Sequence, residues 1–378
     1  MSKSSYVPAL TWLRGLAAFV VVVSHAIRTV EGPWSVSTEG LPAFFTQKLW
    51  FARLFDLGSF GVCLFFALSG FTLYLSNRSA LQRWADVPAF YLKRVARIWP
   101  AFMVSLLVYT VFAKVLWPYY WVEPEGWMQG NFRLPETAGG VMNYVLLMFD
   151  ISGPAGYFVG PYWSLPIEFH YYLLMAPVVI LMARCGSWRW LCPVAAGSAL
   201  LYAGMTLPVP IADTSLLTMS LSFFLGVALA DLHQRQWLPV LKNQFAVWGL
   251  VLAAFGMVTG IWQGLLPWEW MTPAFTGCAI VMIYAFLNIR QKTESGPLTR
   301  LLGRYGTYSY SIYLYHMLSF GAIALGASLL EIQLDESLFW PVFLLGVTSS
   351  YGLAYLSYRW VEVPSIDFGR RLAQRVAR

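Results

Sequence analysis

The stretch LTWLRGLAAFVVVVSHA at residues 10–26 decides the fold class of this chain. It approaches the roughly 20 apolar residues that an α-helix needs to cross the hydrocarbon core of a bilayer. Three further apolar runs of similar length follow at residues 57–75, 216–229 and 245–261. Repeated runs of this length predict an all-α, polytopic integral membrane protein.

The composition supports the same fold class. The 378 residues are 58% hydrophobic and only 11% charged, whereas a soluble domain carries roughly 25% charged residues. So few ionisable side chains cannot build a water-facing surface. The formal net charge of +7 does not indicate nucleic-acid binding, because Lys and Arg cluster in particular loops, as membrane orientation requires. The four cysteines lie in or beside apolar runs without a CxxC pair, which predicts neither a disulfide framework nor a metal site: Cys63, Cys185, Cys192 and Cys278.

The loops between the apolar runs alternate in charge. Lys and Arg dominate the loops that we assign to the cytoplasm, such as residues 78–97 and 290–304, while Asp213, Glu269 and Glu331 lie in the opposite loops. By the positive-inside rule, both termini are cytoplasmic. We expect ten transmembrane helices, near residues 10–27, 57–76, 91–116, 164–184, 190–206, 214–231, 245–262, 271–288, 307–330 and 338–358.

Two outer segments need separate interpretation. Residues 141–149 form an apolar run that is too short to cross, so we expect an interfacial or re-entrant piece. It lies within the long extracytoplasmic loop at residues 117–163, which is rich in aromatic and acidic residues. The aromatic rings are suited to stacking on sugar rings, or else they form the ordinary aromatic belt of a membrane interface. We interpret residues 1–378 as a single transmembrane domain with no appended soluble domain.

Ionisable side chains inside the spans are the candidates for function. Each costs at least a few kcal/mol there, which implies a partner or a water-filled cavity. His316 falls in the middle of the ninth span and either lines a channel or packs. The residues that we single out are Arg14, His25, Glu168 and His316, with Glu362 near the inner end of the last span.

Arg14 and His25 lie eleven positions apart on the first span. Eleven residues make about three turns, so both side chains emerge on nearly the same face, roughly 16 Å apart along the axis. A cation near the cytoplasm and a neutral base near the far side suit a phosphorylated donor with a long reactive arm, such as coenzyme A. His25 alone would more often be a histidine that packs between helices.

The start of the third span and the start of the fourth carry further candidates. Arg94 and Arg97 share one helix face, where their guanidinium groups either bind phosphate or anchor the helix at the cytoplasmic surface. Glu168 lies near the outer end of the fourth span, where it would orient His25. Its alternative role is a structural ion pair with Arg14.

Six motifs in this order resemble those of the membrane acyltransferase-3 family, and the resemblance covers about residues 10–371. Individually each motif is weak, but six in order on a ten-span protein are specific. They are the Arg14 and His25 pair, FGVCLFFALSGFTLYLS at residues 60–76, YLKRVARIWPAF at 91–102, YWSLPIEFHYYL at 162–173, YGTYSYSIYLYHM at 305–317 and VEVP at 361–364.

The resemblance implies transfer of an acyl group, usually acetyl from acetyl-CoA, to a hydroxyl of a sugar-containing acceptor at the bacterial inner (cytoplasmic) membrane. The acceptor is a surface glycan such as O-antigen or exopolysaccharide, or a lipid-linked saccharide. In the family the residues tied to activity match Arg14, His25, Arg94 and Arg97 here. Some relatives carry an extracytoplasmic hydrolase-like domain. Without it, this chain acts alone or passes the acyl group to a separate extracytoplasmic acyltransferase partner.

The resulting hypothesis assigns Arg94, Arg97 and Arg304, together with Arg14, to donor binding. His25, oriented by Glu168, deprotonates the acceptor, although an acyl-His intermediate fits equally well. No metal takes part. The rival is a transporter of a lipid-linked sugar or organic anion, since intramembrane charges also mark transport pathways; no paired halves favour it. The candidate acceptor-binding residues are Tyr162, Trp163 and Ser164, at the start of the fourth span.

Overall fold

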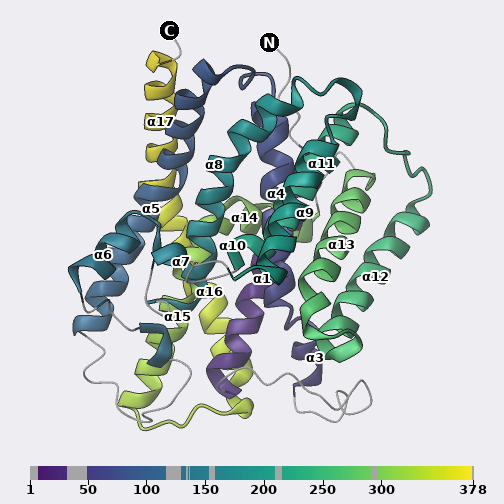
Figure 1. Ribbon diagram of the computed structural model, residues 1–378. Helices are drawn as coiled ribbons and strands as arrows, with labels where there is room; N and C mark the ends of the chain where they lie inside the picture. Colours follow the sequence, from purple (N-terminus) through teal and green to yellow (C-terminus); the bar gives the residue numbers. More distant parts are fainter. Residues whose placement is uncertain are drawn as a thin grey trace.

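The computed structural model describes most of the chain as helices, and the described residues contain no strand. The described residues are 7–31, 49–115, 129–132, 135, 137–152, 158–208, 215–290 and 296–376. The helices run side by side in one bundle, with α12 and α13 at one edge and α5 with α17 at the other (Figure 1). The all-α membrane fold expected from the sequence is confirmed.

Each of the ten expected spans coincides with a helix. Within the described residues, nine helical stretches are long and apolar enough to cross a membrane, some of them by continuing through a short neighbouring element, as residues 215–234 and 244–265 do. The tenth, α9, has only 16 residues. At 1.5 Å per residue, α9 is shorter than the hydrocarbon core. The ten are α1 (Pro8–Glu31), α4 (Gly58–Asn77), α5 (Val87–Val115), α8 (Ser164–Met182), α9 (Leu191–Thr206), α11 (Ser220–Gln234), α12 (Gln244–Gly260), α13 (Trp268–Leu287), α15 (Ser309–Leu329) and α16 (Phe339–Ser357).

Two central helices, α1 and α4, connect the rest of the bundle. They pack against each other, and α4 also packs against α11 and α13. The α4–α11 contact depends on glycine: a Cβ at Gly70 would overlap the Phe223 carbonyl, and one at Gly226 would overlap the Ala67 carbonyl. Small residues that allow such close approach are typical of helix contacts in membranes.

Two amphipathic helices flank the last spans. The expected ninth span begins two residues late, because residues 297–307 form a separate helix, α14 (Pro297–Thr307), that packs against α1. After α16 the chain makes a wide π-type turn, η8 (Tyr358–Glu362), and continues as α17 (Val363–Val376). Figure 1 shows α17 lying along α5, and the two helices are in contact.

The chain between α5 and α8 crosses no membrane within the described residues. The run at 141–149 falls on two short helices, α6 (Ala138–Val145) and α7 (Phe149–Ser152), so its expected failure to cross is confirmed. Phe158 and Val159, which precede α8, are almost fully buried. The 3₁₀ turn η4 (Gly160–Trp163) then leads into α8. The fourth span therefore starts inside the protein and not at its outer surface.

The remaining described elements are short connections between these helices. They are α3 (Trp50–Arg53), η1 (Trp84–Asp86), η3 (Gln129–Phe132), η5 (Gly186–Trp188), α10 (Ser215–Thr218), η6 (Ile261–Leu265) and η7 (Glu336–Leu338).

Candidate functional site

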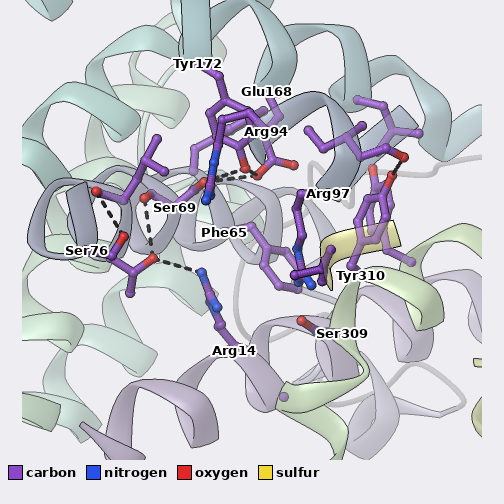
Figure 2. Close-up of a pocket in the computed structure, with 18 of the residues that line it drawn as sticks. Arg14, Phe65, Ser69, Ser76, Arg94, Arg97, Glu168, Tyr172, Ser309 and Tyr310 are labelled. Carbon is purple, nitrogen blue, oxygen red and sulfur yellow. Dashed lines mark hydrogen bonds between the residues drawn. The ribbon is translucent and has the colours of Figure 1, made fainter. Parts of the chain in front are cut away.

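A cavity of about 620 Å³ lies where α1, α4, α5, α8 and α15 meet. Figure 2 shows Arg14, Arg94 and Arg97 reaching toward this cavity from more than one helix. Lys93 and Arg370 also line it, and Glu168 is the carboxylate among its lining residues. The wall is thus strongly cationic. The orientation predicted from the loop charges places it in the cytoplasmic half of the membrane.

Arg14 has a neutral partner in the cavity wall. Its Nη2 donates to Thr72 Oγ1 at 2.9 Å, and the Thr72 hydroxyl in turn donates to the Leu68 carbonyl at 2.7 Å. No ion pair to Arg14 is found among the described residues. A guanidinium group that is buried in a membrane and bonded to a hydroxyl keeps most of its positive charge available for an anionic ligand.

Arg94 is held mainly by aromatic rings. Its Cζ lies 5.9 Å from the ring centroid of Phe90 and 5.9 Å from that of Tyr172. Its Nε is buried and has no hydrogen-bond partner in the described part of the chain. Cation–π contacts orient the guanidinium plane without neutralising the charge, so Arg94 is also available to an anion.

Arg97 differs, because it has a carboxylate partner. It pairs with Glu362, which is fully buried and also accepts a hydrogen bond from Ser311 Oγ at 2.8 Å. The guanidinium group lies 5.8 Å from the ring centroid of Tyr310. Because 32% of the Arg97 side chain remains exposed, Glu362 fixes one side of Arg97 while the other side lines the cavity.

Glu168 does not contact His25, which corrects the predicted pairing. Among the described residues, its carboxylate accepts hydrogen bonds from Ser69 Oγ at 3.0 Å and from the Tyr172 hydroxyl. The reason is the buried start of α8, which places Glu168 deeper than a helix that begins at the membrane surface would. Glu168 and Arg14 line the same cavity, although the sequence placed them at different depths. The catalytic role of Glu168 stays a prediction.

His25 lies outside this cavity, beside His316. The two imidazole centroids are 4.8 Å apart, with the rings inclined at 63°. Each Nδ1 faces backbone carbonyls: that of His25 lies 2.8 Å from the Val21 oxygen, and that of His316 lies 2.9 Å from the Tyr313 oxygen. A carbonyl only accepts, so each ring carries a proton on Nδ1.

Tyr313 separates the cavity from the two histidines. It lines the cavity, and its ring centroid lies 5.8 Å from that of His316. Its hydroxyl accepts from Ser164 Oγ at 2.6 Å and donates to the Pro161 carbonyl at 2.5 Å. The ring of Phe65 packs against it from α4, with the centroids 6.3 Å apart. Tyr313 therefore contacts both the wall of the cavity and the ring of His316.

Besides His25, three predicted site residues do not line the cavity. Tyr162 is fully buried and hydrogen-bonds to Ser105 at 2.8 Å, so it belongs to the aromatic core beneath the loop. Trp163, next to it, is also absent from the lining, whereas Ser164 belongs to it. Arg304 lies on an exposed position of α14, with its side chain directed to Tyr351. Whether each of these residues lines the cavity depends on its angular position around its helix, because neighbouring residues on a helix face different sides.

Several residues of the site were not predicted. Thr72, Tyr172 and Tyr310 line the cavity, but single hydroxyl residues in apolar runs carry no signal of their own. His170 is different, because it is an ionisable residue inside an expected span. It is buried against Asp150, with Nδ1 and Oδ2 3.0 Å apart. The criterion that selected Glu168 applies equally to His170.

Comparison with known proteins gives consistent relatives. The sequence profile of acyltransferase family 3, described as an acyltransferase domain, matches residues 7–359. The acyltransferase MdmB of Streptomyces mycarofaciens is 30% identical over 340 residues, which cover 82% of this chain and 78% of the relative. The exopolysaccharide production protein ExoZ of Rhizobium meliloti (strain 1021) is 25% identical over 333 residues, which cover 85% and 93% of the two chains. No solved structure matches.

Proposed function

Because the chain belongs to acyltransferase family 3, we propose that it moves an acetyl group from cytoplasmic acetyl-CoA to a hydroxyl of a cell-surface or lipid-linked glycan. Family membership favours a membrane acyltransferase over a transporter. The name of one relative, an exopolysaccharide production protein, supports a sugar-containing acceptor. A multi-pass protein with a cytoplasmic donor and a surface acceptor belongs in the bacterial inner membrane.

The observation that carries this proposal is the convergence of Arg14, Arg94 and Arg97 on one cavity. Guanidinium groups match phosphate oxygens in geometry and charge. Arg14 and Arg94 have no ion-pair partner among the described residues, so a bound phosphorylated ligand would supply the missing negative charge. A thioester on a long flexible arm would then extend past Tyr313 toward His25.

In the proposed reaction, His25 acts as the base. Its Nε2 takes the proton of the acceptor hydroxyl, the oxygen attacks the thioester carbonyl, and the carbon–sulfur bond breaks to release the coenzyme thiolate. The alternative route places the acyl group on His25 first. Glu168 contributes by holding the hydroxyls of Ser69 and Tyr172 in the cavity wall, without contacting His25.

The acceptor and any protein partner follow from the same scheme. A hydroxyl must reach His25 from the side opposite the donor cavity, which agrees with an extracytoplasmic glycan or a lipid-linked saccharide dissolved in the membrane. If the acyl group leaves the membrane on another carrier, a separate extracytoplasmic acyltransferase receives it. Ser164 contacts Tyr313 and lies at the passage between the two sides.

The test uses the purified full-length protein in liposomes with acetyl-CoA labelled in the acetyl group. We expect release of free CoA and transfer of label to cell-envelope glycan, with kcat lowered about 10²- to 10⁴-fold by His25→Ala. Binding of CoA by the variant should be unchanged, because His25 does not line the cavity. The proposal fails if the wild-type protein turns over no short acyl-CoA in the presence of crude envelope glycan.

A second experiment separates the two chemical routes. Wild-type protein is incubated with labelled acetyl-CoA in the absence of acceptor, quenched and examined for label bound to protein. Label on His25 indicates the acyl-enzyme route, whereas its absence, with full turnover once acceptor is added, indicates direct transfer.

A further inference from the structure

His316 is the second histidine of the transfer region, and nothing in the scheme above uses it. Its side chain is fully buried on α15. Its ring touches two groups that bound the path of the acyl group: Tyr313, which lines the donor cavity, and His25, on the acceptor side. His316 therefore lies between the place where the donor binds and the place where the acceptor is deprotonated.

The hydrogen bonds of His316 leave one of its nitrogens unused. Nδ1 lies 3.1 Å from the Ile312 carbonyl and 2.9 Å from the Tyr313 carbonyl, so it carries the proton. Nε2 is buried and has no hydrogen-bond partner among the described residues. A buried polar atom without a partner lowers stability. A residue that only filled space on this helix would avoid that loss by being apolar.

We propose that His316 is a catalytic acid–base residue that passes the acceptor's proton to the sulfur of the leaving group. This inference rests on the proposed acyl-CoA chemistry. His25 Nε2 removes the hydroxyl proton as the oxygen bonds to the thioester carbon. The proton then moves from His25 Nε2 to His316 Nε2. As the carbon–sulfur bond breaks, the sulfur keeps the bonding electrons and takes this proton, which leaves the free thiol and two neutral imidazoles.

The geometry supports a transfer in this direction. Because both Nδ1 atoms face backbone carbonyls, the proposed exchange runs between the two Nε2 atoms. The centroid separation of 4.8 Å, with the rings inclined at 63°, places the edge of one ring against the other ring. The thiolate appears on the side of Tyr313, from which the donor enters, and the His316 ring centroid lies 5.8 Å from that of Tyr313. In this scheme His25 serves the acceptor hydroxyl, and His316 serves the sulfur of the leaving group.

The test compares His316→Asn and His316→Gln with the wild-type protein in liposomes. Asn keeps an amide N–H near the position of Nδ1 and removes Nε2, while Gln places an amide that cannot ionise near Nε2. We expect both to lower kcat for acetyl-CoA about 10²- to 10⁴-fold, with the Kd for CoA within about threefold of the wild type. The matched control is Ser319→Ala, one turn further along α15 and also buried, which should keep kcat within about threefold.

A second readout addresses the leaving group directly. With a phenyl thioester of acetate, whose thiolate needs less help from an acid, the His316 variants should lose less than about tenfold, whereas His25→Ala should lose as much as with acetyl-CoA. An Asn variant that keeps near-normal kcat would show that His316 only packs, and an equal loss with both thioesters would exclude the acid role. So would a loss of activity that merely follows a loss of thermal stability. An inactive wild-type protein would instead refute the proposed function.

Discussion

The first helix carries an arginine near each end, and the two have opposite surroundings. Toward the C-terminal end of α1, the Nη2 of Arg28 donates hydrogen bonds to Asp56 Oδ1 at 3.0 Å and to Asp56 Oδ2 at 2.8 Å. Each of these two side chains is only 3% exposed. Toward the N-terminal end, the hydrogen-bond partner of Arg14 among the described residues is the Thr72 hydroxyl. Arg28 is neutralised by a carboxylate and buried, whereas Arg14 keeps its charge and lines a cavity.

This difference separates structural charge from functional charge in a membrane protein. A buried ion pair offsets the desolvation of both partners only when the geometry is good, as it is for Arg28 with Asp56. A buried arginine that has only neutral partners lowers the stability of the protein unless a bound ligand supplies the opposite charge. Arg97 is intermediate, since Glu362 holds one side of it and the cavity the other. We therefore expect substitutions at the two ends of α1 to affect different properties.

The largest effect should come from Arg28→Ala, which leaves the Asp56 carboxylate buried without a counter-charge. Loss of one partner of a buried pair costs about 3–5 kcal/mol, so Tm should fall strongly, while the activity of the protein that remains folded is unchanged. Thermal unfolding of the purified variant in detergent measures this.

The double variant Arg28→Met with Asp56→Leu is the matched control. It removes both charges and should recover most of the lost stability. If Arg28→Ala instead abolished CoA binding in folded protein, the outer arginine would belong to the donor site and the comparison would not hold.

The next largest effect should come from Arg94→Ala and should appear in donor affinity. Loss of a hydrogen bond to a charged group costs about 1.5–3 kcal/mol, which corresponds to a Kd for CoA raised roughly 10- to 100-fold. Stability should stay the same or rise, because a buried unpaired charge disappears. Titration calorimetry with CoA, together with Tm, tests both expectations.

Arg94→Lys is the matched variant. It keeps the charge but loses the planar group that lies against Phe90 and Tyr172, so its affinity should lie between those of the wild type and Arg94→Ala. An unchanged Kd in Arg94→Ala would mean that this arginine only anchors its helix at the cytoplasmic surface.

The smallest effect should come from Thr72→Val, which keeps the shape of the side chain and removes the hydroxyl that accepts from Arg14. One neutral hydrogen bond contributes about 0.5–1.5 kcal/mol, so the Kd for CoA should change by up to about tenfold. The direction tells whether Thr72 holds Arg14 toward the ligand or away from it. A loss of stability as large as that of Arg28→Ala would contradict the view that Arg14 is weakly held.

Much of the fold could be predicted because burial in lipid imposes length and composition on each helix. The run at 141–149 was too short to cross and does not cross, and α9 coincides with its expected span at residues 190–206. The arginines of the cavity were also singled out, Arg14 as a charge inside an apolar run, and Arg94 with Arg97 as a pair on one helix face. Arg304 was assigned to donor binding from a cytoplasmic loop, but it lies on the separate helix α14 and does not line the cavity. Tyr162 was assigned to acceptor binding, and that role stays a prediction.

The depth of α8 could not be predicted. The residues just before it, Phe158, Val159 and Tyr162, are buried, and no local sequence pattern indicates that a span begins inside the protein. As a result Glu168 lines the arginine cavity and does not meet His25.

The sequence by itself determined that this chain is a bundle of apolar helices and that a few ionisable residues lie within them, because the hydrocarbon core constrains every segment separately. Only the tertiary structure decided which of those residues meet. Partners from α1, α4, α5, α8 and α15 are brought together by helix tilt, rotation and close packing, and these depend on contacts between segments far apart in the chain. The sealed Arg28–Asp56 pair, the open arginine cavity and the paired histidines all arise at that level.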